Sequence, residues 1–145
     1  CGFSGDPIKA CLCSPRAVDR YRRRFSGPLL DRFDLRVTVG RPERAGLVGP
    51  RGESSETVRE RVASARARQA ERGPLNRALS RAELDALPWE PAAIRLLHAA
   101  VERFAVTGRG YDRVRRVART TADLEGAHAV GETHAAEALG LRNEW

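Results

Sequence analysis

The chain has 145 residues, a net charge of +7, 41% hydrophobic residues and 31% charged residues. This balance is typical of a globular chain rich in surface helices and excludes a fully disordered one. No apolar run approaches the roughly 18–20 residues that a membrane span needs, so we expect no membrane partner and a cytoplasmic location. Because the sequence contains no Met and opens on Cys1, we interpret it as a fragment or a processed product of a longer protein.

The chain begins with a cysteine-rich loop. Residues 1–13 contain Gly, Pro and three cysteines but no helical period, which is typical of a loop or knuckle. Ser14 and Pro15 then have the residue types of an N-cap and a first helical position. We therefore expect a helix from Pro15 to about Arg24.

A break, a short helix and a strand are predicted next. Residues 26–28 (SGP) should end the first helix, and a short turn of helix should cover 29–33. Residues 35–39 (LRVTV) alternate apolar and polar side chains, the pattern of a half-buried strand. A single strand cannot satisfy its own backbone hydrogen bonds, so it needs a sheet that this segment does not supply.

The remainder of the sequence is predicted to be a linker and a helical bundle. Residues 40–53 are rich in Gly, Pro and charge, which indicates a linker. Residues 54–145 have helical spacing, N-cap residues and stop signals but no strand pattern. Helices are expected over about 54–72, from 80 (with a Ser80–Glu83 capping box), from 91, over 107–125 and over about 131–142.

Cys1, Cys11 and Cys13 form the first candidate site. Thiolates in a Gly/Pro-rich knuckle can bind zinc tetrahedrally, but a closed structural site needs four ligands. The fourth could be Asp6, a distant histidine or a cysteine preceding Cys1. The alternative is that three reduced thiols hold a loop without metal.

Arg32 is the second candidate, because it sits on a short element that apolar residues anchor. An arginine so placed can reach a phosphate on a neighbouring subunit and stabilise the charge that develops during transfer. The competing interpretation is a structural arginine that pairs with Asp31 or Asp34.

Arg109 is the third candidate, at a predicted helix start where backbone N–H groups also favour an anion. The same helix carries further arginines that could contact nucleic-acid phosphates: Arg113, Arg115, Arg116 and Arg119. The rival hypothesis is therefore a basic helical module that binds nucleic acid without catalysis. A solvated basic face is the simpler interpretation.

No phosphate-binding loop (GxxxxGK[ST]) or acidic magnesium site occurs in the sequence, so this chain alone is expected to be inactive.

Two long stretches resemble the magnesium-chelatase-related AAA+ ATPases of the ComM/YifB-like family. Residues 1–39, CGFSGDP…CLCSPRAVDRYRRRFSGPLLDRFDLRVTV, are similar to the family segment CPCGYxGDP…CxCSPxQxxRYxxRISGPLLDRIDLxVxV. Residues 107–142 are similar to its late signature, SxRxYxRxLRVARTIADL…HxxEAxxxR. The resemblance therefore covers nearly the whole chain except the linker at 40–53.

The resemblance implies a mainly α chain: the end of an AAA+ α/β core over 1–39, a linker over 40–53 and an α-helical lid over 54–145. It implies that Arg32 is an arginine finger offered to ATP on the neighbouring subunit. Arg109 would be the sensor-2 arginine, which reaches ATP bound in its own subunit.

The same resemblance implies cofactors and partners. ATP and Mg²⁺ would be bound by the longer protein, whose own upstream ATPase core and neighbouring subunits in a homo-oligomeric ring would be the partners of this chain. The family also has a cysteine two positions before the equivalent of Cys1, which strengthens the hypothesis of bound Zn²⁺. ComM-like members are associated with natural transformation and DNA branch migration, so DNA is the implied substrate.

Overall fold

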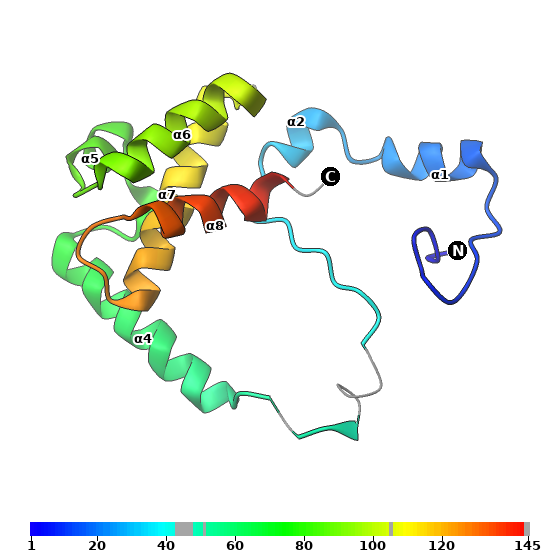
Figure 1. The fold of residues 1–145 in the computed structure, drawn as a ribbon, viewed down its shortest axis with the longest axis horizontal. Helices are drawn as coiled ribbons and strands as arrows, with labels where there is room; N and C mark the ends of the chain where they lie inside the picture. The colour runs from blue at the N-terminus through cyan, green and yellow to red at the C-terminus, as the bar shows by residue number, and fades with distance from the viewer. Residues whose placement is uncertain (43–47, 51, 105, 144–145) are drawn as a thin grey trace. The chain divides into compact units, whose positions relative to one another are not determined.

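The computed structural model describes residues 1–42, 48–50, 52–104 and 106–143. The chain divides into two compact units, Cys1–Phe33 with Thr38–Pro50, and Asp34–Val37 with Arg51–Trp145. Every regular element in the described ranges is a helix, which confirms the mainly α prediction (Figure 1). None of the helices in these ranges is long and apolar enough to cross a lipid bilayer.

The first unit holds two short helices, α1 (Pro15–Arg22) and α2 (Gly27–Leu30). Ser14 caps α1 and Ser26 caps α2, because each side chain accepts a hydrogen bond from the backbone N–H three residues later. The second helix begins at Gly27, two residues before the predicted turn, since proline is accepted in the first turn of a helix. Neither helix contains a buried residue.

The strand predicted over 35–39 is wrong for this structure. These residues are described but have no regular structure, and Val37 and Val39 are 67% and 87% exposed. The N–H of Arg36 donates a hydrogen bond to the carbonyl of Leu141 at 2.7 Å. The alternating pattern is present, but no neighbouring strand is available among the described residues to complete a ladder.

The second unit is a helical bundle whose capping signals match the sequence. Ser54, Ser80 and Thr107 cap their helices, and Ser80 forms the predicted capping box with Glu83. Gly126 ends the longest buried helix with a left-handed φ of 76°. The elements are α4 (Ser55–Arg72), η1 (Asn76–Ala78), α5 (Arg81–Ala86), α6 (Pro91–Phe104), α7 (Gly108–Glu125) and α8 (Glu132–Asn143).

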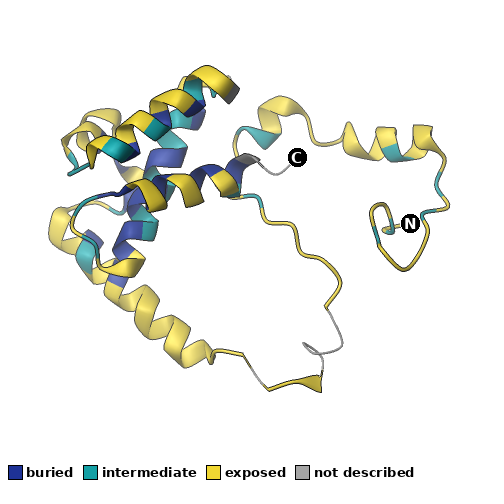
Figure 2. Ribbon diagram, viewed as in Figure 1, coloured by how far each residue is buried: buried dark blue, intermediate teal, exposed yellow. Residues whose placement is uncertain are grey.

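The core of this unit forms around α7, which packs against α8, α4, α5 and η1, while α6 packs against α8 (Figure 2). Small residues dominate the contact: Ala118 and Ala122 of α7, and Ala135 and Ala138 of α8, are at most 1% exposed. Alanines leave little side chain between the two axes, so the helices can approach closely. The first half of α4 is exposed, and its burial begins at Ala65.

Candidate functional site

Arg32 follows α2 directly in the first unit. The turn continues past the helix through two backbone hydrogen bonds, from Arg32 N–H to the Leu29 carbonyl (3.0 Å) and from Phe33 N–H to the Leu30 carbonyl (3.2 Å). Arg32 is exposed, while Leu30 is partly buried. A capped helical turn thus presents a cationic side chain at the surface of its unit.

Arg109 lies in the first turn of α7, in the second unit. The N-cap Thr107 accepts hydrogen bonds from Gly110 N–H at its side-chain oxygen (3.0 Å) and from Tyr111 N–H at its carbonyl (2.8 Å). The turn contains no acidic residue, so nothing in it neutralises the partial positive charge of the helix start. Arg109 is exposed and forms no hydrogen bond or ion pair with any residue that the structure describes. The arrangement suits an anion that approaches from solvent.

A groove of about 490 Å³ opens beside this turn, between α5, α6 and the start of α7. Its lining contains positively and negatively charged side chains and the rings of His98 and Tyr111. The centroids of these two rings are 6.3 Å apart. The presence of Asp85 and Glu102 in the lining disfavours a phosphate inside the groove itself.

The three cysteines come together in the first unit. Their sulfur atoms all lie within 4.8 Å of one another, and the sulfurs of Cys1 and Cys11 are 3.5 Å apart. Thiolates bound to one zinc at about 2.3 Å in a tetrahedron would be about 3.8 Å apart, so this spacing fits a shared metal.

Asp6 is not arranged as the fourth ligand. Its carboxylate accepts from the backbone N–H groups of Lys9 (2.7 Å) and Ile8 (2.9 Å) and pairs with Arg41 at 2.9 Å. The hydrogen bond from Lys9, then that from Ile8 and then that from Arg41 hold the pKa of Asp6 below its ordinary value. The described residues therefore bring together three ligands of the four that a closed zinc site requires.

Two family models match the chain: "Magnesium chelatase, subunit ChlI" over residues 1–47, and "Magnesium chelatase, subunit ChlI C-terminal" over residues 52–142. The chain belongs to the magnesium chelatase ChlI family. The two matches confirm the family resemblance that the motifs indicated. The helical second unit of the chain contains the residues that match the C-terminal model.

Within this family the chain is similar to ComM/YifB-like proteins. It is 39% identical to the competence protein ComM of Haemophilus influenzae over 133 residues, 89% of this chain and 26% of that protein. It is 36% identical over 135 residues to the uncharacterized protein YifB of Escherichia coli, covering 90% of the chain and 26% of YifB. An uncharacterized protein of Mycobacterium tuberculosis is 38% identical over 138 residues, with 91% and 27% covered. The chain thus spans about a quarter of these relatives.

The predicted arginine stripe on α7 is largely engaged inside the unit. Arg115 is 5% exposed, pairs with Asp85 at 2.7 Å and lies over the rings of Trp89 and Tyr111. Arg116 donates twice to the carbonyl of Leu79. Arg113 forms an ion pair with Asp34, and Arg119 forms one with Asp123. These contacts leave little of the stripe for nucleic-acid phosphates, which disfavours the basic-module hypothesis.

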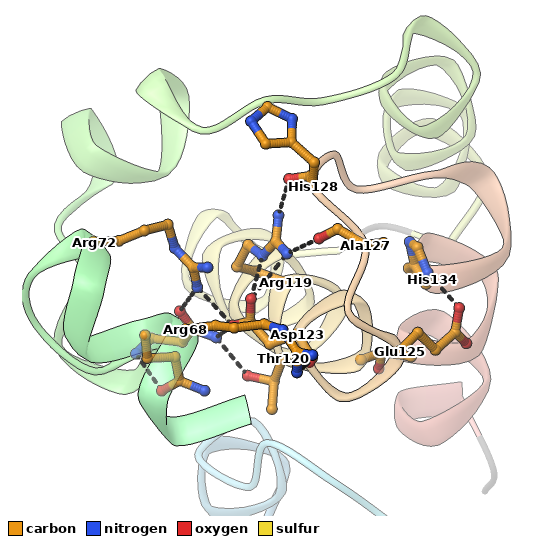
Figure 3. Close-up of polar contacts among 12 residues, drawn as sticks. Arg68, Arg72, Arg119, Thr120, Asp123, Glu125, Ala127, His128 and His134 are labelled. Atoms are coloured by element: carbon orange, nitrogen blue, oxygen red, sulfur yellow. Dashed lines mark hydrogen bonds and ion pairs between the residues drawn. The ribbon is translucent and has the colours of Figure 1, made fainter. Parts of the chain in front are cut away.

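Sequence reasoning missed a buried polar network around Asp123 (Figure 3). Arg119, 1% exposed, donates to Asp123 Oδ1 (2.9 and 3.1 Å) and to the backbone carbonyls of Ala127 and His128. Asp123 Oδ2 accepts from Arg72 (2.6 Å) and from Asn76 (2.8 Å). The i,i+4 spacing of Arg119 and Asp123 was the available signal, but spacing alone does not distinguish a buried pair from a surface one.

Burial and pairing act in opposite directions on Asp123. Burial raises the pKa of this carboxyl. The hydrogen bonds from Arg72 and Asn76 and the charge of Arg119 lower the pKa, and their combined effect exceeds that of burial. The pKa of Asp123 therefore lies below its ordinary value. Asp123 is therefore ionised at neutral pH, fully buried and neutralised by two arginines. It connects α4, η1 and α7.

Proposed function

We propose that the chain supplies the arginine finger and the sensor-2 lid of a cytoplasmic AAA+ ring motor that hydrolyses ATP and acts on DNA. In this proposal Arg32 reaches the ATP of a neighbouring subunit, and Arg109 reaches the ATP of its own subunit. The phosphate-binding loop and the acidic magnesium site would come from the upstream ATPase core. ATP and Mg²⁺ would be bound there.

The observation that carries the proposal is the contrast between Arg109 and the other arginines of α7. Those at 113, 115, 116 and 119 are engaged within the second unit, whereas Arg109 is exposed at the capped, acid-free start of the helix. A charge-assisted contact from such a position adds to the pull of the helix N-terminus on an anion. Arg32 is likewise exposed after a capped turn.

DNA is the proposed substrate because of the relatives. The Haemophilus influenzae relative is named a competence protein, and competence concerns the uptake of DNA for natural transformation. We propose that the ring couples ATP hydrolysis to the movement of branched DNA.

The decisive experiment is steady-state ATP hydrolysis by the whole ATPase with and without branched DNA. Stimulation supports the proposal, while absence of any turnover would favour the basic binding module.

Arg109→Ala is expected to raise the KM for ATP in the whole ATPase about 10–100-fold, because a charge-assisted hydrogen bond contributes about 1.5–3 kcal/mol. The measurement is the dependence of initial rate on ATP concentration. Arg95→Ala is the matched control, since Arg95 is an exposed arginine on α6. Equal KM values for the two variants would remove Arg109 from the proposed nucleotide site.

We also propose that Cys1, Cys11 and Cys13 are three thiolate ligands of one Zn²⁺ ion, with the fourth ligand outside this cluster. Titration of the chain with Co²⁺ should develop thiolate charge-transfer absorption at a stoichiometry of about one, and Zn²⁺ should displace it. Cys11→Ser or Cys13→Ser should weaken binding more than the about 10–100-fold that loss of an outer-shell partner costs. Ser4→Ala, in the same loop, should not. Equal affinity of all variants would leave three metal-free thiols.

A further inference from the structure

The side chain of Arg142, near the end of α8, lies against the first turn of α7. A Cβ atom built on Gly110 would be 2.9 Å from Nη2 of Arg142 and 3.1 Å from Cγ1 of Val106. Gly110 is buried, and Arg142 is only 7% exposed. The guanidinium can occupy this place because residue 110 has no side chain.

This contact is confined to one side of the turn that carries Arg109. A Cβ atom on Gly108, in the same turn, would meet nothing within 4 Å. Arg109, between the two glycines, is exposed. The turn is therefore supported from the interior by Arg142 and is open to solvent where Arg109 projects.

The start of a helix carries a partial positive charge, so a neighbouring cation does not stabilise its dipole. The first turn already has its N-cap in Thr107. The buried side chain of Arg142 therefore packs against the backbone of the turn that carries Arg109 without capping it.

We propose that Arg142 is a positioning residue, which packs through the gap at Gly110 and holds Arg109 in the orientation that meets the nucleotide phosphates. The inference rests on the proposed role of Arg109. It adds that this role depends on Arg142 in α8, 33 positions after Arg109, and on a glycine at position 110.

The test compares Gly110→Ala with Gly108→Ala in the whole ATPase. Both substitutions put alanine into the first turn of α7, so both change helix propensity alike. Only Gly110→Ala introduces a methyl group into the space of Arg142, whose Nη2 is the end of a flexible side chain. The same methyl group would lie 3.1 Å from Cγ1 of Val106 and 3.2 Å from Oγ1 of Thr107, so the comparison is read together with the Arg142 variants. Because a misplacement of about 1 Å can cost about a hundredfold, we expect kcat/KM for ATP to fall about 10–100-fold in Gly110→Ala. Gly108→Ala should stay within about twofold of wild type.

A double-mutant cycle separates positioning from a general structural effect. If Arg142 acts through Arg109, Gly110→Ala should cause no further loss in the Arg109→Ala background. Arg142→Ala should behave in the same way, and Arg142→Lys should retain part of the activity, since it keeps the charge but loses the planar fork. The melting temperatures of Gly110→Ala and Gly108→Ala should agree.

The outcomes distinguish the two proposals. If Arg109→Ala leaves kcat/KM unchanged, the role of Arg109 itself is wrong. If Arg109→Ala lowers kcat/KM but Gly110→Ala matches Gly108→Ala, Arg109 acts without Arg142 and this inference is overturned. The inference is also overturned if Gly110→Ala causes the same loss with and without Arg109.

Discussion

Asp123→Asn is expected to lower the free energy of unfolding of the helical unit by about 3–5 kcal/mol at pH 7, the cost of breaking a buried ion pair from one side. The substitution keeps the shape of the side chain but removes its charge. Arg119, 1% exposed, then loses its anion. The introduced amide has a single accepting oxygen, so it cannot accept from Arg119 at one position and from Arg72 and Asn76 at the other. A typical domain has about 5–15 kcal/mol of stability, so this is a large fraction.

The measurement is urea unfolding of the 145-residue chain followed by circular dichroism. Glu53→Gln is the matched control, because it removes the carboxylate from the exposed bidentate pair with Arg61. Exposed pairs contribute about 0–1 kcal/mol, so the control should stay near wild type. A loss of less than about 1 kcal/mol in Asp123→Asn would mean that the network does not hold α4 to α7.

The stability that Asp123 contributes should depend on pH in a definite direction. Its pKa is lower in the folded chain than its ordinary value of 3.8. The contribution is therefore fully present above about pH 4 and is lost as the pH falls through the folded pKa. The difference in unfolding free energy between wild type and Asp123→Asn should shrink below about pH 4, and a constant difference down to strong acid would contradict this assignment.

Arg32→Ala is expected to lower ATP turnover by the whole ATPase about 10³–10⁵-fold, the effect of removing an arginine finger, with little change in nucleotide affinity. The reason is that the guanidinium would stabilise charge that develops during transfer more than the bound ground state. The measurements are kcat and the dissociation constant for a fluorescent ATP analogue. Arg22→Ala is the matched control, since Arg22 is an exposed arginine in the last turn of α1.

Mixed rings test whether Arg32 acts across subunits. Subunits with Arg32→Ala and subunits with Arg109→Ala should each be impaired alone. When mixed, they form some interfaces in which an intact Arg32 faces a nucleotide site with an intact Arg109, so turnover should partly recover. Absence of recovery, or loss of nucleotide binding in Arg32→Ala, would reduce Arg32 to a structural residue.

The sequence alone was sufficient for the family and for most helix boundaries. Ser54, Ser80 and Thr107, the observed N-caps, stand at the predicted starts of their helices, and Gly126 follows the end predicted at 125, because capping depends on hydrogen bonds within a few residues. The long ordered motifs at both ends indicated the magnesium chelatase family, and two family models match them. Capping and sequence motifs depend on residues close together in the chain, so the sequence alone determines them.

The tertiary structure decided everything that depends on partners distant in the sequence. The alternation over 35–39 did not become a strand, because a strand needs a neighbour and the described chain offers none. Arg119 resembled its neighbours on α7 until its burial against Asp123, Ala127 and His128 set it apart. The surroundings of Gly110 are a second example, since a Cβ atom there would meet Nη2 of Arg142, which lies on another helix. Sequence patterns record which face of an element is apolar, but only packing decides which charges are buried and which remain available to a ligand.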